Sequence, residues 1–204
     1  MNTEILFRIS IAIIGLLLAT VRVYYTAKAI QSGEPFWRPE GDTRQLVFGT
    51  IGMLIIFPIV VYVFAPGWLA WAALALPAGL RWIGGALGLI SFALLIWVHH
   101  TLGKNFSLPG VIKRQQELVT RGPYGWVRHP MYSVLFLISL AYFLISANWL
   151  IGVAWLGWIT GTVASMVGTE EAALIATFGD AYRTYMRHTG RFLPRIRWAE
   201  GGAP

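Results

Sequence analysis

The sequence predicts an all-α integral membrane protein. Of its 204 residues, 56% are hydrophobic and only 12% are charged, and the mean hydropathy is +0.61. A soluble domain carries about 25% charged residues, whereas lipid-facing helices are apolar around their whole circumference. Ten Trp and eight Tyr suit membrane interfaces, where half-polar rings collect. Because the chain has no cysteine, disulfides, thiolate metal sites and cysteine nucleophiles are excluded.

Apolar stretches of sufficient length predict five transmembrane helices, since about 20 residues cross the hydrocarbon. A two-helix hairpin is expected at Ala147-Asn148-Trp149, because this short turn forces the last two helices to run antiparallel. The apolar stretch 65–79 is expected to be an interfacial loop on the outer side, with a re-entrant segment as the alternative. The N-terminal stretch lacks a basic flank and a cleavage site, so we expect a retained span. The predicted spans are about 5–26, 46–64, 80–100, 130–147 and 149–168.

We expect two parts in the chain. Residues 1–79 form two spans with the outer interfacial loop. Residues 80–204 form a second part with three spans, a cytoplasmic loop 101–129 and a C-terminal helix.

The distribution of basic residues predicts the orientation. The net charge is +7 and the pI about 10.1, which in a soluble protein would indicate nucleic acid. Here 13 of the 16 basic residues lie on one side of the five-span arrangement, and such residues stay cytoplasmic. We therefore expect no nucleic-acid partner, an outer N-terminus and a cytoplasmic C-terminus, in a bacterial inner membrane. Arg8 and Arg22, near opposite ends of the first span, are expected to snorkel toward the interfaces.

Glycines inside the predicted spans indicate closely packed helices. Gly84, Gly85 and Gly88 lie in the third span, and Gly157 and Gly161 in the fifth. Small residues let helix backbones approach each other in membranes. We expect all five to serve that purpose.

Beyond Gly168 the pattern becomes amphipathic. Thr169 is expected to cap a new helix whose first turn holds Glu170 and Glu171, which the helix dipole favours. Apolar and aromatic residues then recur at helical spacing. This predicts a C-terminal amphipathic helix on the cytoplasmic surface.

Two polar clusters could carry chemistry. Arg128 and His129 precede Pro130, which suits the first turn of a helix, so they lie at a helix N-terminus, a natural anion site. A basic flank at the membrane boundary explains them equally well. The hairpin must place this cluster beside Glu170 and Glu171. Opposed charges with aromatic neighbours favour a zwitterionic ligand.

The two clusters together resemble the isoprenylcysteine carboxyl methyltransferase family. The resemblance covers about residues 80–195, and related phospholipid N-methyltransferases share much of it. The residues that carry it are Gly122, Tyr124, Arg128, His129, Pro130 and Tyr132, followed by Glu170, Glu171, Phe178, Gly179, Tyr182 and Tyr185.

This resemblance implies a methyltransferase that takes its methyl group from S-adenosylmethionine at the cytoplasmic ends of the last two spans. It implies catalytic roles for Arg128 and Glu171. The acceptor is expected to be a small lipophilic or lipid-like molecule. The cofactor-binding residues that the resemblance implies are Gly122, Tyr124, Arg128, His129, Pro130, Tyr132, Glu170 and Glu171.

The sequence departs from the prenylcysteine enzymes where those have basic residues for the substrate. These positions hold Leu95 and Ala164–Met166, and Ser107 stands where some members have His. We therefore expect an acceptor other than a free carboxylate; Arg22 is the nearby residue that could replace the missing arginines. His99 and His100 are adjacent, a poor spacing for metal ligands, so no metal is expected. The remaining alternatives are a phospholipid N-methyltransferase, a nicotinamide-dependent membrane reductase and a non-enzymatic membrane protein.

Overall fold

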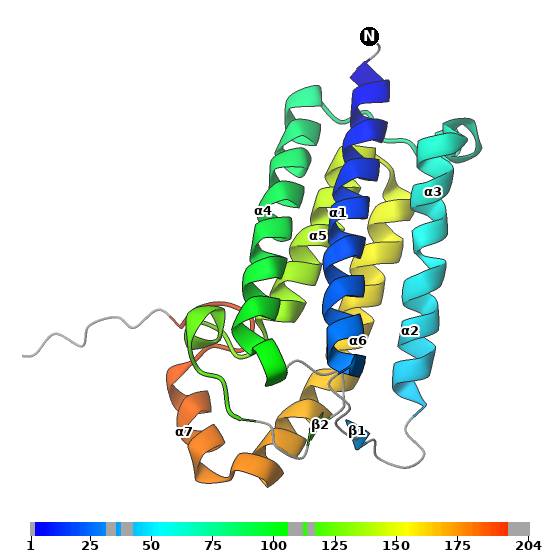
Figure 1. Cartoon of the computed structure of the whole chain (residues 1–204). Coiled ribbons are helices and arrows are strands. Elements are labelled where there is room, and N and C mark those ends of the chain that lie inside the picture. The colour runs from blue at the N-terminus through cyan, green and yellow to red at the C-terminus, as the bar shows by residue number, and fades with distance from the viewer. Residues whose placement is uncertain (1–2, 32–35, 38–42, 106–111, 114–116, 196–204) are drawn as a thin grey trace, which may run out of the picture.

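The computed structural model describes residues 3–31, 36–37, 43–105, 112–113 and 117–195. Long helices stand side by side in one bundle, and shorter segments gather at one end of it (Figure 1). Of the residues named above, Ser107 lies outside the described ranges. The elements are α1 (Thr3–Gln31), β1 (Phe36–Trp37), α2 (Arg44–Leu54), α3 (Ile56–Phe64), η1 (Pro66–Ala72), α4 (Ala78–Leu102), η2 (Gly103–Asn105), β2 (Ile112–Lys113), η3 (Gly122–Gly125), α5 (Pro130–Ser146), α6 (Trp149–Phe178) and α7 (Asp180–His188).

The all-helical membrane architecture is confirmed. Four helical stretches are long and apolar enough to cross a membrane, and α5 is apolar but shorter, with 17 residues. The second stretch is interrupted at Ile55, between α2 and α3, because Pro58 has no N–H to donate to the carbonyl of Leu54. The only strands in the described ranges are β1 and β2, which pair antiparallel with Phe36 opposite Lys113. The four stretches are Thr3–Gln31, Leu46–Phe64, Ala78–Leu102 and Trp149–Phe178.

Helix α5 lies at the centre of the bundle and packs against α1, α4 and α6. Its side chains Ile138, Tyr142 and Ile145 are buried. Large apolar side chains elsewhere point outward, among them Leu16 at 70% and Phe64 at 79% exposure. An apolar core with an apolar outer surface is the arrangement that a lipid environment requires.

The turn between α5 and α6 is tied to the predicted interfacial loop. Asn148 caps α6 by accepting a hydrogen bond from the N–H of Ile151, and its side-chain amide donates to the carbonyl of Leu69 in η1. The N–H of Leu74 donates to the carbonyl of Ala147. Residues 65–79 therefore fold over the end of the hairpin, a contact that the sequence analysis did not predict.

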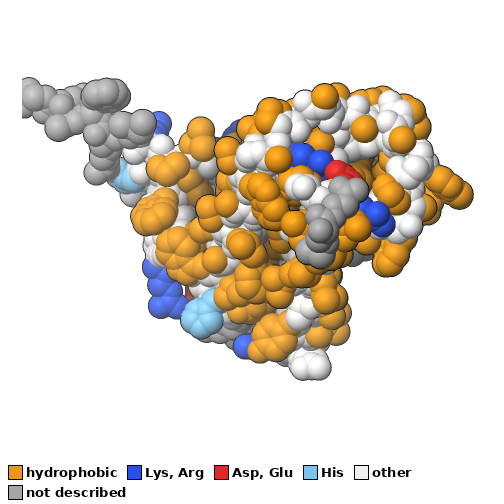
Figure 2. All heavy atoms as spheres, turned by 90° about the horizontal axis from the view of Figure 1, so that it is seen from above, with side chains coloured by type: hydrophobic (Ala, Val, Ile, Leu, Met, Phe, Trp, Pro, Cys, Tyr) orange, Lys and Arg blue, Asp and Glu red, His pale blue; other side chains and the backbone are white. Residues whose placement is uncertain are grey.

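Figure 2 shows the same end of the bundle from above: its surface is mainly hydrophobic, with few charged side chains. At this end of the bundle, Arg81 donates to both carboxylate oxygens of Glu4, to the Tyr62 hydroxyl and to the carbonyl of Ile145, and it lies 3.8 Å over the Phe7 ring. These bonds connect α1, α3, α4 and α5 at one point.

Arg8 belongs to the same end and does not snorkel as predicted. Its guanidinium Nε donates to the carbonyl of Val63 at 2.8 Å. That carbonyl lies in the last turn of α3, where no helical N–H is available to it. The arginine therefore satisfies a helix end in place of water.

Helix α6 corrects one prediction about the C-terminal part. It continues without a break from Trp149 to Phe178, so Thr169 does not begin a helix; its hydroxyl donates to the carbonyl of Met166 within α6. The helix ends at Gly179, whose φ of +56° suits glycine. Consequently Glu170 and Glu171 are interior residues of α6, and the dipole of a new helix does not explain them.

The prediction that glycines mark close helix contacts is confirmed at three of the five positions. A Cβ at Gly84 would lie 2.7 Å from Cβ of Leu144, one at Gly88 would lie 2.7 Å from Ile14, and one at Gly161 would lie 3.2 Å from Phe48. Gly157 is different, because a Cβ there would meet nothing within 4 Å. The prediction is wrong for Gly157, and Gly85 has no tight neighbour either.

We expect Gly84→Ala to destabilise the protein by about 1–3 kcal/mol, because overpacking would push α4 away from α5. Gly157→Ala is the matched control and should leave stability unchanged or slightly raised, since alanine is the better helix former. Thermal unfolding of the detergent-solubilised variants measures both. Equal melting temperatures for the two variants would contradict the packing explanation.

Candidate active site

Two segments distant in the sequence lie side by side at the end of the hairpin opposite Ala147-Asn148. The residues before α5 form a parallel bridge with the residues after α7, at Val127 and Gly190. Glycine is required there, because a Cβ at Gly190 would lie 1.8 Å from the carbonyl oxygen of Leu193. Three further hydrogen bonds fix the register: Arg128 N–H to Gly190 O, His129 N–H to Arg191 O, and Ser133 Oγ to Phe192 O.

Glu171 of α6 is the charged centre of this region. Its carboxylate accepts from Arg128 Nε at 3.0 Å, from His129 Nε2 at 3.3 Å, and from the Arg191 guanidinium. Only 5% of the Glu171 side chain is exposed. A charged carboxylate buried to this extent destabilises the fold unless cationic partners and hydrogen bonds compensate its desolvation.

The two arginines, Arg128 and Arg191, differ in their exposure and in the number of protein groups that they contact. Arg128 is 10% exposed, and besides Glu171 it donates to the carbonyls of Met186 and Thr189. The Arg191 side chain is 48% exposed, and its hydrogen bond to Glu171 raises its pKa. Arg128 is therefore held by the protein, while Arg191 offers a permanent positive charge to a ligand.

Glu170 and its neighbours form the second half of the cluster. The Tyr132 hydroxyl donates to Glu170 Oε1 at 2.8 Å, and His129 Nδ1 lies 3.8 Å from Glu170 Oε2. The Glu170 side chain is 19% exposed. Two carboxylates and two guanidiniums thus share a small volume with balanced formal charge.

The loop before α5 is shaped by a glycine. Gly122 has a φ of +58°, and a Cβ there would lie 3.0 Å from Thr101 Oγ1. The turn lets η3 pack on the end of α4 and buries Tyr124, whose carbonyl accepts the Tyr185 hydroxyl at 2.5 Å. Burial raises the pKa of the Tyr124 hydroxyl.

The structure therefore brings together most of the residues that the sequence analysis singled out. Arg128, His129, Glu170, Glu171 and Tyr132 make direct contacts, whereas Gly122, Tyr124 and Pro130 shape the backbone around them. The sequence analysis missed Arg191. A regular hydrophobic pattern gives no signal for it, because Arg191 follows α7 and reaches Glu171 only through the bridge at Gly190.

Burial lowers the pKa of His129, and this outweighs the opposite effect of Glu171. The folded protein thus favours neutral imidazole, whereas the unfolded chain takes up a proton near pH 6.5. The unfolded state binds more protons below that pH, so stability should fall as the pH decreases from 6.5 toward the lower folded pKa.

Melting temperatures of the ligand-free protein between pH 5 and 7.5 test this expectation. The decrease in melting temperature toward low pH should be smaller for His129→Gln than for the parent. His188 is exposed, and the His188→Gln variant should show the same pH dependence of the melting temperature as the parent. A His129→Gln variant with the parent's pH dependence would contradict the expectation.

Comparison with known proteins supports an assignment to a family. The family model described as phospholipid methyltransferase matches residues 80–181, half of the chain. The protein-S-isoprenylcysteine O-methyltransferase of Schizosaccharomyces pombe is 31% identical over 96 residues, which are 46% of this chain and 41% of that protein. The human enzyme of the same name is 31% identical over 101 residues, 48% of this chain and 35% of that one.

Two further relatives match more of the chain. The methanethiol S-methyltransferase of Pseudomonas deceptionensis is 26% identical over 202 residues, covering 89% of this chain and 72% of that one. The structure of the eukaryotic intramembrane Ras methyltransferase, an isoprenylcysteine carboxyl methyltransferase, has a TM-score of 0.53 at 25% identity and covers 78% of this chain and 55% of that chain.

These matches define a class of integral membrane proteins with a helical bundle. The chain belongs to the phospholipid methyltransferase family, and within it resembles the isoprenylcysteine carboxyl methyltransferases. It spans about two-fifths of the length of the isoprenylcysteine enzymes that it matches.

Proposed function

We propose that the protein is a membrane methyltransferase that uses S-adenosylmethionine and methylates a small lipophilic acceptor. The observation that carries the proposal is the group around Glu171, at the facing ends of α5 and α6, in which Arg191 stays half exposed. The membership of residues 80–181 in a methyltransferase family supports it.

The residues suit the chemistry of this donor. A carboxylate group on a ligand requires a cation or N–H groups, which Arg191 supplies, and an ammonium group or ribose hydroxyls suit Glu170. An aromatic wall for an adenine is available from Tyr185 of α7, whose side chain is half-buried. When bound, S-adenosylmethionine supplies an electrophilic methyl group on a sulfonium.

The same contacts refine the predicted roles. We propose Arg191 and Glu170 as residues that touch the donor. Arg128 and Glu171, expected to be catalytic, are proposed as positioning residues, because their polar atoms are already bonded within the protein. Methyl transfer needs chiefly alignment and exclusion of water, and a rigid ion network provides alignment.

A thiol is the acceptor that we favour. A relative that aligns over 89% of the chain is named a methanethiol S-methyltransferase. Leu95 and Met166, at positions where prenylcysteine enzymes have basic residues, are 1% and 6% exposed here. An ionised carboxylate beside such side chains would cost several kcal/mol. N-acetyl-S-farnesylcysteine should therefore be a poor substrate.

Calorimetric titration of the detergent-solubilised protein distinguishes the alternatives. S-adenosylhomocysteine should bind and NADPH should not; the reverse result would indicate a nicotinamide-dependent reductase, and binding of neither a non-enzymatic protein. Transfer of labelled methyl groups to ethanethiol, and not to phosphatidylethanolamine, would distinguish the thiol enzyme from a phospholipid N-methyltransferase.

We also propose that α5 is a fifth span and that α7 lies on the cytoplasmic surface. Seventeen residues of helix measure about 25 Å, at the lower limit for crossing, and α5 is enclosed by longer helices. In α7, Tyr182 is buried while Arg183 and Arg187 are exposed. The division into residues 1–79 and 80–204, and the bacterial inner membrane, belong to the same proposal.

Reporter fusions test this topology. A reporter active only in the periplasm should give a signal at the N-terminus and after residue 72, and none after residues 115 and 204. A periplasmic signal after residue 115 would overturn the orientation.

A further inference from the structure

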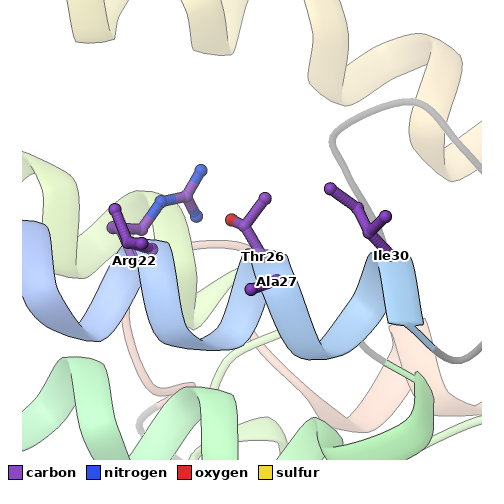
Figure 3. A pocket seen from close by; sticks show the side chains of 5 residues that line it. Arg22, Thr26, Ala27 and Ile30 are labelled. Carbon is purple, nitrogen blue, oxygen red and sulfur yellow. The ribbon is translucent and has the colours of Figure 1, made fainter.

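A groove runs along the inner half of α1. It has a volume of about 340 Å³ and is lined by Arg22, Val23, Thr26, Ala27 and Ile30. Figure 3 shows the side chains of Arg22, Thr26 and Ile30 pointing from one face of α1 into open space. Apart from the guanidinium and the Thr26 hydroxyl, the lining side chains are apolar.

Arg22 differs from the other well-ordered arginines of the bundle. Arg8, Arg81 and Arg128 each donate to a carbonyl or carboxylate. Within the part of the chain that the structure describes, no carboxylate or carbonyl lies within hydrogen-bonding distance of Arg22. A cation inside a membrane helix costs about 2.5–3.5 kcal/mol on insertion scales, and such residues mark ligand or ion sites.

The groove is on the same side of the membrane as the Glu171 cluster. Arg22 lies nine residues before the end of α1 at Gln31, and it interacts electrostatically with His99 in the last turn of α4. His99 is buried, with its Nδ1 2.8 Å from the carbonyl of Leu95 and its ring against Tyr25. A continuous core cluster extends from this level to Tyr124 in η3.

We propose that this groove holds the acceptor and that Arg22 binds its sulfur as the thiolate. The inference rests on the proposed function and adds the binding site and the ionisation state of the acceptor. Charge complementarity selects the occupant: the apolar walls accept an alkyl chain, and a desolvated guanidinium requires an anion. A neighbouring positive charge lowers the pKa of an acid by about 1–3 units, so a thiol bound here ionises at a lower pH than the same thiol in water.

Methyl transfer from the donor to this thiolate balances in atoms and electrons. On binding, the S–H bond breaks and the proton passes to the buffer. The thiolate sulfur uses a lone pair to form a bond with the methyl carbon of the sulfonium donor. The carbon–sulfonium bond breaks, and its electron pair stays on the donor sulfur, which leaves as a neutral thioether.

Proton release tests the binding step without turnover. Ethanethiol is titrated calorimetrically into the protein at pH 7 with S-adenosylhomocysteine present, in buffers of different ionisation enthalpy. The parent should release a measurable fraction of a proton for each thiol bound. Arg22→Met should release almost none. Lys28→Met, which removes a cation from the same helix outside the groove, should behave like the parent.

Kinetics with two thiols test the chemical consequence. At pH 7, Arg22→Met should reduce kcat/KM for ethanethiol about 10- to 100-fold, as a change of 1–2 units in thiol pKa implies. The loss should be much smaller for the more acidic 2,2,2-trifluoroethanethiol and should diminish as the pH rises. Arg22→Lys should recover part of the rate. Because His99 and Tyr25 are ionisable groups close to Arg22, the comparison of two thiols at one pH is decisive.

Results that contradict the thiol acceptor can be distinguished from results that contradict the role of Arg22. If the parent binds S-adenosylhomocysteine but methylates neither thiol, the thiol acceptor of the proposed function is wrong. If the parent methylates both thiols and Arg22→Met shows the parent's proton release and the same ratio of rates, the role of Arg22 is wrong. An Arg22→Met variant equally impaired with both thiols at every pH would show a structural role and would also overturn the inference.

Discussion

Glu171→Gln is expected to abolish measurable binding of S-adenosylhomocysteine and to lower the free energy of unfolding by about 3 kcal/mol. The substitution keeps the shape of the side chain but removes the charge that Arg128 and Arg191 share. Removing one partner of a buried ion network leaves the others desolvated without compensation, which is strongly destabilising. Calorimetric titration and thermal unfolding in detergent measure the two effects.

A matched control exists in α7. Asp180 pairs with Arg183 at 3.0 Å, but its side chain is 94% exposed, so Asp180→Asn should change neither quantity. Parental affinity and stability in Glu171→Gln would mean that the network around Glu171 neither binds the donor nor supports the fold.

Arg81→Met is expected to lower stability by about 2 kcal/mol and to leave the affinity for S-adenosylhomocysteine unchanged. The Arg81 side chain is 12% exposed, and its removal would take the cationic partner from Glu4 and the donor from the carbonyl of Ile145, while the Tyr62 hydroxyl would still donate to Glu4. Because Glu4 is 40% exposed, water compensates part of the loss, so the effect is smaller than for Glu171→Gln. The network lies at the opposite end of the bundle from Glu171, so the site should stay intact.

Thermal unfolding and calorimetric titration of Arg81→Met, with the exposed Arg183→Met as the control, test this separation. A reduced affinity with unchanged stability is the result that would contradict it.

The sequence was sufficient to predict the hairpin and the meeting of its two polar clusters. The turn at Asn148 is too short for any other arrangement, and the predicted spans 130–147 and 149–168 have similar lengths, so their far ends must lie together. The same reasoning was available for Glu4 and Arg81, which begin the first and third spans at the same side of the membrane. Their ion pair was not among the predicted contacts.

Other features depend on tertiary contacts that local patterns do not encode. Thr169 followed by two glutamates has the appearance of a helix start, yet packing carries α6 through it to Phe178. Gly157 is a small residue of the kind found at close helix contacts, but a Cβ there would meet nothing within 4 Å. Arg191 contributes to the Glu171 network only because Gly190 allows the chain to pass beside Val127.

The bridge between Val127 and Gly190 has a consequence for biosynthesis. A ribosome releases the chain from its N-terminus, so every bundle helix is made before residues 189–195 emerge. Until then Glu171 can meet Arg128 and His129 but lacks Arg191. The nascent protein would thus be inserted in the membrane with an incomplete charge cluster, and a chain truncated at residue 188 would remain in that state permanently.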